Sequence, residues 1–179
     1  MSLPLGLPFV LSSSDLSLLN GASMESPSIE SLLKKLKSEE VLVREMATQA
    51  LWQIWFEQKG MIGYQVLQRS QGLLQAGDVG QAESILNQLI ATMPDFAEAW
   101  NRRAVLYYVQ QHYRQAIADC QQVIRLNPIH FGALHGLGLS YVAIEDYAAA
   151  IPAFRRALEI QPYSLENQRM ILECTLKLG

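Results

Sequence analysis

A 34-residue period is the feature that most restricts how this chain can fold. Pro94, Pro128 and Pro162 recur at that spacing, and Ala82, Ala116 and Ala150 recur in register with them. The other columns with the same period are Val66, Trp100 and Leu134; Ser70, Ala104 and Gly138; Leu73, Tyr107 and Tyr141; Leu86, Cys120 and Phe154; and Leu89, Val123 and Ala157. A period of this length is that of one helix–turn–helix unit of a solenoid.

The apolar spacing within each unit is helical. Trp100, Arg103, Ala104 and Tyr107 follow an i, i+3, i+4, i+7 pattern, which places them on one face of a helix. The column of small residues predicts a position where two helices cross closely. Each periodic proline is expected to end the second helix of its unit, because proline lacks the N–H that continues the hydrogen-bond ladder.

The third unit carries the motif that identifies the repeat. Leu134, Leu137, Gly138, Tyr141, Ala150, Phe154, Ala157 and Pro162 match W-x₂-L-G-x₂-Y…A-x₃-F…A…P, with only the opening aromatic replaced. These residues resemble the tetratricopeptide repeat. The resemblance covers residues 63–164 as three units (63–96, 97–130 and 131–164), of which the first departs most from the motif. It implies an all-α fold, a right-handed α-solenoid.

The segments on either side of the repeats are interpreted from their patterns. Residues 1–27, rich in Ser, Pro and Gly, are expected to form a poorly ordered tail. Residues 28–62 predict a helical pair, which is either a single HEAT-like unit that includes Arg44 or a cap packed onto the first repeat through Trp52, Trp55 and Phe56. Residues 165–179 predict an amphipathic helix that caps the end of the solenoid.

Composition narrows the functional classes. The formal net charge of −3 argues against a nucleic-acid binder that relies on overall positive potential. Residues 1–33 contain no Lys or Arg, which excludes the basic region of a secretory signal, and no segment predicts a membrane span. Two cysteines are too few for a disulfide framework. A cytoplasmic location, or the plastid stroma in a eukaryote, is therefore expected.

Motifs for chemistry are missing from the sequence. The three histidines form no metal-ligand spacing, no CxxC is present, and no glycine-rich phosphate loop or nucleophile motif occurs. The basic run 34-KKLK-37 is flanked by Glu30, Glu39 and Glu40, so a solvated helix face is the expected role. We therefore expect no catalytic residue, no cofactor and no metal, and the chain is predicted not to be an enzyme.

Function is then expected from a surface. The resemblance implies a concave wall, made by the first helix of each unit, that binds an extended peptide or a helix of a partner protein. An alternative is that the chain's own N-terminal tail covers part of this wall. By register the partner-binding wall would comprise Tyr64, Leu67, Gln71, Leu74, Asn101, Arg102, Val105, Tyr108, His135, Leu139 and Val142.

One specific family function is disfavoured by the residues present. Chaperone-binding members hold a C-terminal carboxylate with Lys, Asn and Arg side chains, whereas the matching positions here carry Leu67, Gln71, Arg102, Gly132 and Gly136. Only Arg102 supplies a cation there, so the two-pronged clamp is missing.

The preferred interpretation is a non-enzymatic adaptor or scaffold. The stretches 98-EAWNRRA-104 and 128-PIHFGALHGLG-138 look similar to bacterial and plastid tetratricopeptide proteins, which suggests a role in complex assembly. A regulatory or accessory subunit of an enzyme is the alternative, and a nucleic-acid-binding solenoid is a third class that the sparse positive charge disfavours. Association of the chain with itself, through one end or the groove, is a further prediction.

The adjacent arginines Arg102 and Arg103 are predicted to have different roles. Neighbouring residues on a helix point about 100° apart. Arg103 belongs to the packing column and needs a buried partner, for which Asp119 on the next helix is the candidate. Arg102 is expected to face the concave wall and to contact a partner.

Overall fold

The computed structural model describes residues 27–179, and over that range the secondary structure is entirely helical, as predicted. The predicted tail lies almost wholly outside the described residues. The helices are α1 (Ile29–Lys35), α2 (Val41–Glu57), α3 (Gly60–Gln75), α4 (Val79–Thr92), α5 (Ala97–Val109), α6 (Tyr113–Leu126), α7 (Phe131–Ala143), α8 (Tyr147–Ile160) and α9 (Leu165–Leu178).

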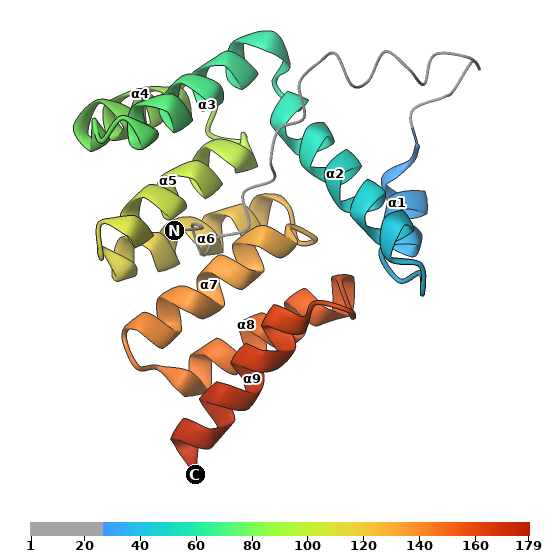
Figure 1. Cartoon of the computed structure of the whole chain (residues 1–179). Helices are drawn as coiled ribbons and strands as arrows, with labels where there is room; N and C mark the ends of the chain where they lie inside the picture. Colours follow the sequence, from blue (N-terminus) through green and yellow to red (C-terminus); the bar gives the residue numbers. More distant parts are fainter. Residues whose placement is uncertain (1–26) are drawn as a thin grey trace.

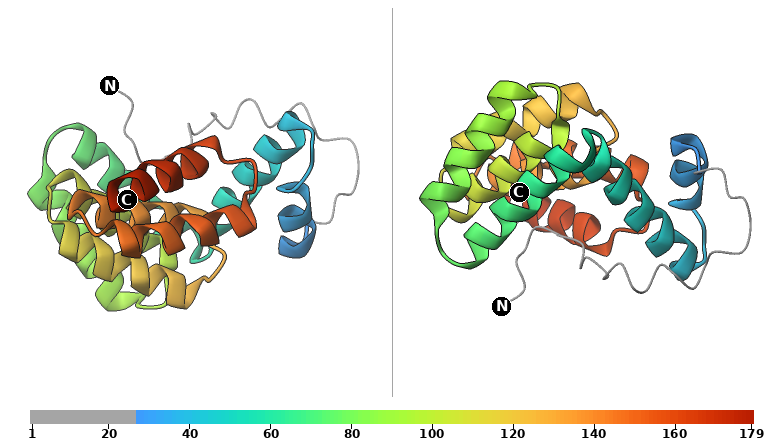
Figure 2. Two further views of the ribbon diagram at one scale, coloured as in Figure 1. Left: turned by 90° about the horizontal axis from the view of Figure 1, so that it is seen from below. Right: turned by 90° about the horizontal axis from the view of Figure 1, so that it is seen from above.

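Six of these helices form three antiparallel pairs stacked into a solenoid. The pairs are α3–α4, α5–α6 and α7–α8, and each is joined by a short turn (Figure 1). The first helices α3, α5 and α7 contact one another in sequence and make one layer, while α4, α6 and α8 lie behind them (Figures 1 and 2). Helix α9 packs along α8 and covers the end of the stack.

The periodic residues explain where the helices end and how closely they pack. Helices α4, α6 and α8 end at Thr92, Leu126 and Ile160, in each case two residues before the periodic proline. The column Ala82, Ala116 and Ala150 is fully buried, with 0% of each residue exposed. A side chain larger than a methyl group would not fit where the two helices of a unit cross.

The turn inside each unit repeats as well. Gly77, Gln111 and Glu145, which are 34 residues apart, all have positive φ angles, of 80°, 63° and 61°. The N–H of the following residue bonds back across the turn; for example, His112 N donates to Tyr107 O at 2.8 Å. This left-handed residue closes the first helix in each unit and turns the chain into the second helix.

The start of the first unit differs from its predicted position. Helix α3 begins at Gly60, so the predicted boundary between residues 62 and 63 lies inside the helix. Gly60 has a φ of 66°, which lets the chain change direction three residues after the end of α2. Helix α3 therefore has 16 residues, whereas α5 and α7 have 13 each.

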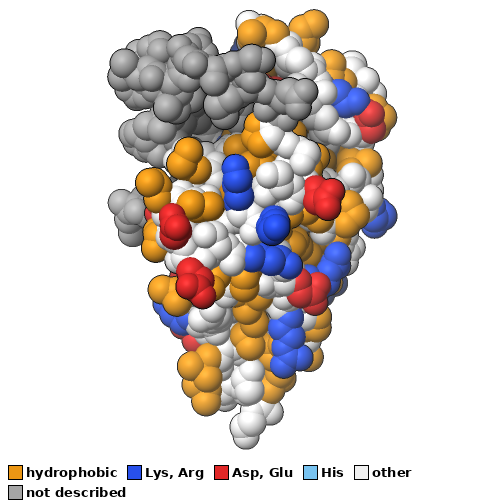
Figure 3. Space-filling view, turned by 90° about the vertical axis from the view of Figure 1, so that its right-hand side faces the viewer, with side chains coloured by type: hydrophobic (Ala, Val, Ile, Leu, Met, Phe, Trp, Pro, Cys, Tyr) orange, Lys and Arg blue, Asp and Glu red, His pale blue; other side chains and the backbone are white. Residues whose placement is uncertain are grey.

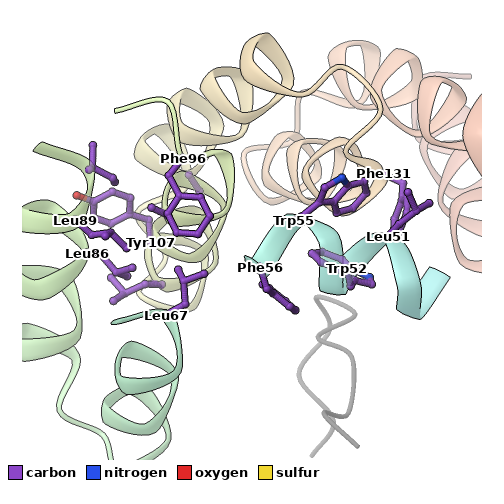
Figure 4. Close-up of a cluster of buried hydrophobic side chains, with 14 of the residues drawn as sticks. Leu51, Trp52, Trp55, Phe56, Leu67, Leu86, Leu89, Phe96, Tyr107 and Phe131 are labelled. Atoms are coloured by element: carbon purple, nitrogen blue, oxygen red, sulfur yellow. The ribbon is translucent and has the colours of Figure 1, made fainter. Parts of the chain in front are cut away.

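The largest group of buried apolar side chains joins α2 to the solenoid. It extends from Leu67, Leu86 and Phe96 in the first unit, through Tyr107 in the second, to the rings of α2 and Phe131 of the third unit (Figure 4). Leu51, Trp52, Trp55 and Phe56 of α2 are each no more than 6% exposed, so this helix is part of the core and not an appendage.

Candidate functional site

Helix α2 lies across the layer that contains α3, α5 and α7. Its Trp52 and Trp55 rings lie against Phe131, at the start of α7 (Figure 4). They also lie against His130, on which Trp55 stacks with ring centroids 4.4 Å apart. Helix α2 contacts α3 of the first unit, and its two tryptophan rings also extend beyond that repeat. Their aromatic contacts with the solenoid are with the last residue of the second unit and the first residue of the third, because α2 crosses the stack.

Two polar contacts attach the first half of α2 to the far end of the solenoid. Gln161 Nε2 donates a hydrogen bond of 3.1 Å to Thr48 Oγ1, and the Arg44 guanidinium lies 4.4 Å from the centroid of the Tyr163 ring. Gln161 and Tyr163 belong to the turn between α8 and α9. Helix α2 thus bridges all three units, whether or not its pairing with α1 is counted as a HEAT-like unit.

Gly132, the second residue of α7, makes room for this crossing. A Cβ atom at that position would lie 2.6 Å from Cη2 of Trp52 and 2.8 Å from Cζ2. Carbon atoms pack at about 3.5–4.0 Å, so any side chain there would displace the indole. The sequence places Gly132 at a clamp position and does not identify Trp52 as its neighbour.

A buried polar cluster lies beneath α2. Glu98, with 0% exposure, has Oε2 2.9 Å from Nε2 of His130, and its Oε1 accepts a 3.0 Å hydrogen bond from Asn101 Nδ2. The backbone N–H of Ala133 donates to His130 Nδ1 at 3.0 Å, so the ring proton is on Nε2 and is donated to Glu98. His130 is therefore a neutral imidazole in this arrangement.

Arg102 supplies the cation of this cluster. Its Nε lies 3.5 Å from Glu98 Oε1, its Nη1 donates to Gln71 Oε1 at 2.8 Å, and its guanidinium lies 4.8 Å from the Phe56 ring centroid. Burial lowers the pKa of Arg102, and the carboxylate of Glu98 opposes that shift. The side chain is only 9% exposed. Arg102 faces the predicted wall, but α2 covers its side chain. The guanidinium therefore contacts residues of this chain, Gln71, Glu98 and Phe56, and does not lie in an open groove.

The part of the concave layer that α2 does not fill is a cavity of about 360 Å³. It lies between α2, α5, α7 and the start of α9. Its lining is formed by Thr48, Trp52, Asn101, Ala104, Val105, Tyr108, Cys120, Phe131, Gly132, His135, Gly136, Ser140, Gln161, Ser164, Glu166 and Asn167. Aromatic rings from α2, α5 and α7 meet amide, hydroxyl and imidazole groups in this space.

The predicted wall residues divide into three groups. Asn101, Val105, Tyr108 and His135 line the cavity. Leu67, Gln71 and Arg102 lie in or beside the contact with α2, and Tyr64 and Leu74 pack against the same core. Leu139 and Val142 pack in the cluster that holds Met170 and Cys174 of α9.

The polar groups on the α9 side of the cavity are held in fixed orientations. Asn167 Nδ2 donates to Ser164 Oγ at 3.0 Å, which leaves its Oδ1 to accept from Nδ1 of His135 at 2.7 Å. Asn167 is 3% exposed and lies in the first turn of α9. Because Nδ1 of His135 is a donor here, Nε2 of the neutral ring is an acceptor.

Sequence reasoning did not identify the cavity residues outside the three helical pairs, namely Thr48, Trp52, Gln161, Ser164, Glu166 and Asn167. The three units show no column for them, because they belong to the capping segments and to a turn. One signal was available in the sequence, since Asn101 and His135 are 34 residues apart and so share a repeat position.

Arg103 lies between the helices of its own unit. Its Nε and Nη2 donate to the two carboxylate oxygens of Asp119 at 2.8 and 2.9 Å, and its Nη1 donates to Asn87 at 2.7 Å. The bond to Asp119 raises the pKa of Arg103. The two neighbouring arginines therefore have different environments, Arg103 in an ion pair between two helices and Arg102 under α2.

Other chemistry is limited in the residues that the structure describes. Burial raises the pKa of the Cys120 thiol to about 12, so this cavity-lining thiol stays protonated near neutral pH and is a poor nucleophile. Between residues 27 and 179, no group of three or more His, Cys, Asp or Glu side chains is placed to hold a metal ion. Over the same range, no helix is both long and apolar enough to cross a membrane.

The face seen in Figure 3 shows basic, acidic and apolar side chains interspersed, with none of them dominant. Lys34, Lys35 and Lys37 are exposed, while Leu36 between them is 1% exposed. The lysines thus lie on a solvated face of the short N-terminal helical segment. This surface provides no broad field of one sign for steering a charged partner.

Comparison with known proteins agrees with this architecture. Models of the tetratricopeptide repeat match residues 67–111, 97–130 and 131–164. The chain belongs to the tetratricopeptide repeat family. The matches at 97–130 and 131–164 coincide with the second and third helical pairs, the match at 67–111 extends from within α3 through α5, and α2 and α9 lie outside all of them.

Relatives of the chain include several larger repeat proteins. A TPR repeat-containing protein of Rhizobium etli is 35% identical over 98 residues, which are 55% of this chain and 48% of that protein. A BBSome complex member BBS4 homolog of Drosophila melanogaster is 27% identical over 67% of this chain and 24% of its own length. This tetratricopeptide repeat chain therefore spans half or less of these two relatives.

Solved structures show the same fold. The first TPR of Spaghetti (RPAP3), bound to an HSP90 peptide, has a TM-score of 0.61 at 18% identity over 63% of this chain and 90% of that chain. A structure of MamA has a TM-score of 0.60 at 21% identity over 84% of this chain and 80% of that chain. At these identities the likeness concerns the fold alone.

Proposed function

We propose that this tetratricopeptide repeat protein is a non-enzymatic adaptor that holds a segment of a partner protein in the cavity beside α2. The observation that supports this most directly is the cavity itself, about 360 Å³ in volume and lined by Asn101, Val105, Tyr108 and His135 of the inner helices. Its volume is at the lower end of the range of about 300–1,000 Å³ typical of ligand pockets.

The dimensions favour an extended segment over a helix. A helix with its side chains is about 10–12 Å wide, and α2 already occupies a helix-sized portion of the concave layer through Trp52, Trp55 and Phe56. The cavity that remains beside α2 can accommodate a few side chains of a peptide whose backbone lies along the rim of the cavity. We therefore propose an extended peptide as the ligand.

The known peptide ligands of the structural neighbours are a weaker guide. The RPAP3 domain and a yeast Sti1 domain were solved with HSP90 and Hsp70 peptides, respectively. In this chain Leu67 and Gln71 lie in or beside the contact with α2, and Gly132 lies against Trp52. Three positions that would carry clamp residues are thus taken by the chain's own packing, which supports a ligand other than an acidic chaperone tail.

A role in assembling a larger complex is part of the proposal. The relatives include a BBSome complex member homolog, a superkiller complex protein and a subunit of the anaphase-promoting complex, and these names describe those proteins. An accessory subunit of an enzyme would use the same cavity, and the identity of the recovered partner distinguishes these two roles. A cytoplasmic or stromal location and the lack of a nucleic-acid ligand stay predictions.

Affinity capture from a lysate of the source organism tests the proposal. The full chain is compared with the Asn101→Ala/Tyr108→Ala variant, which alters two cavity residues, and with Arg114→Ala/Gln115→Ala, which alters two exposed residues of α6. We expect the cavity variant to lose partners that the wild type and the α6 variant both retain. Recovery of the same proteins by all three would show that this cavity is not the binding site.

A further inference from the structure

The polar groups that line the cavity present acceptors to a ligand. Asn101 is 5% exposed and its Nδ2 donates to Glu98, which leaves Oδ1 without a partner among residues 27–179. The Glu98 carboxylate accepts and does not donate, so the amide orientation is fixed. Asn101 lines the cavity and no donor from the described part of the chain bonds to this oxygen, so it is available to accept a hydrogen bond from a ligand there.

A second acceptor faces the same space from the next repeat. His135 donates through Nδ1 to Asn167 Oδ1 at 2.7 Å, which makes Nε2 an acceptor in the neutral ring. No protein donor for this nitrogen is found within the described range. Asn101 and His135 share a repeat position and both line the cavity, so the two acceptors lie on adjacent inner helices.

Aromatic rings surround these acceptors. Trp52 of α2, Tyr108 of α5 and Phe131 of α7 contribute to the lining. The faces of such rings carry negative partial charge and attract cations, with Trp the strongest of the three. Three rings together with two hydrogen-bond acceptors are the features that a guanidinium or ammonium group requires.

The charges around the cavity agree with this chemistry. No Lys or Arg side chain is part of its lining, and the only charged residue in the lining is Glu166. Glu166 is 51% exposed and pairs with Arg169 at 2.7 Å on the solvent side. Arg102 is next to Asn101 in sequence, but its Nη1 bonds to Gln71 of α3 and its guanidinium lies over Phe56 of α2. Its positive charge is therefore located beside α2 and α3 and is not part of the cavity lining.

We propose that the cavity takes a basic side chain, arginine or lysine, from the bound peptide. This inference rests on the proposed function and specifies its ligand. The cation would stack against the rings of Trp52 and Tyr108 and donate hydrogen bonds to Asn101 Oδ1 and His135 Nε2. The preference is opposite in sign to that of a site built to hold a carboxylate.

Four synthetic peptides test the preference. They share the sequence acetyl-Gly-Ser-Ala-Ala-X-Ala-Ala-Ser-Gly-amide, where X is arginine, glutamine, leucine or glutamate, and each is titrated into the ¹⁵N-labelled full chain by NMR. We expect the arginine peptide to bind at least about tenfold more tightly than the glutamate peptide, the effect of one cation–aromatic contact and one or two hydrogen bonds. The shifted signals should include those of Asn101 and His135.

Two variants separate the contributions of the lining. Tyr108→Leu removes an aromatic wall, and Asn101→Leu removes the amide acceptor. We expect each to weaken arginine-peptide binding by about three- to tenfold. Arg114→Ala/Gln115→Ala on the outer face should leave it unchanged. If Asn101→Leu fails to fold because Glu98 loses its amide donor, the half-buried Tyr108 position still provides the measurement.

The outcomes distinguish this inference from the proposed function. Tighter binding of the leucine, glutamine or glutamate peptide at the same signals would overturn the cation preference and leave the cavity as a peptide site. Absence of arginine-peptide binding, or shifts confined to other surfaces, would overturn the cation preference as well. If the cavity variants also recover the wild-type partners from the lysate, the proposed function itself is wrong.

Discussion

Replacing Gly132 by alanine should dislodge α2 from the inner layer of the solenoid. The added methyl group would lie 2.6 Å from Trp52 Cη2, about 1 Å closer than two carbon atoms pack. The indole has little room to move, since Trp52 is 5% exposed and lies against Phe131 and His130. Overpacking of this kind costs about 1–3 kcal/mol of unfolding free energy.

A matched control isolates the packing cost from helix propensity. Gly80 is the second residue of α4, as Gly132 is of α7, and a Cβ at Gly80 meets no atom within 4 Å. Both substitutions gain the same helix propensity, up to about 1 kcal/mol. We therefore expect Gly132→Ala to be less stable than Gly80→Ala by about 1–3 kcal/mol.

Urea unfolding, measured by circular dichroism and tryptophan fluorescence, gives the unfolding free energies of the Gly132→Ala and Gly80→Ala variants. Combining Gly132→Ala with Trp52→Leu should remove most of the clash, so the two changes should be non-additive in a double-mutant cycle. Equal unfolding free energies for Gly132→Ala and Gly80→Ala would refute the placement of Trp52 against α7. Strict additivity with Trp52→Leu would refute it as well.

Two further predictions concern buried groups of the second unit. Because Arg103 and Asp119 form a bidentate pair with side chains only 16% and 6% exposed, Arg103→Leu and Asp119→Leu should each cost about 3–5 kcal/mol of unfolding free energy. The double variant should be more stable than either single variant, and an equally unstable or less stable double variant would contradict the pairing argument. The pKa of the Cys120 thiol is raised by burial from 9.0 to about 12, so the stability it contributes is present below about pH 9 and is lost as the pH rises from there toward 12. Unfolding free energies measured from pH 8 to 11 should therefore fall less steeply for Cys120→Ala than for the wild type, and parallel curves would contradict the burial of the thiol.

The solenoid was predictable because its residues recur. Each repeat position is seen three times, once in each unit, so the buried alanines, the periodic prolines and the helix ends follow from the spacing alone. The difference in orientation between Arg102 and Arg103 followed from helical geometry. The same geometry indicated Asp119 as the residue opposite Arg103, where the structure shows the two hydrogen bonds.

The position of α2 was not predictable by the same reasoning. Trp52, Trp55 and Phe56 mark an apolar face, but a face without a periodic counterpart does not indicate which surface covers it. The positions that receive α2 look unremarkable in sequence, since His130 lies in the turn before α7 and Gly132 lies at the start of that helix. For the same reason the cavity could not be located, because two of its walls come from α2 and α9, outside the repeats.

The contact between Thr48 and Gln161, which are 113 residues apart in the chain, limits how many repeats can lie between the two ends of α2. A solenoid ordinarily grows by stacking, and each unit contacts only its neighbours. Helix α2 has 17 residues and is about 26 Å long, enough to cross two steps of about 10 Å between the inner helices. A further unit inserted between α3 and α7 would move Gln161 beyond its reach. Helix α2 thus limits to three the units that lie between its contact with α3 and its contact with the turn after α8.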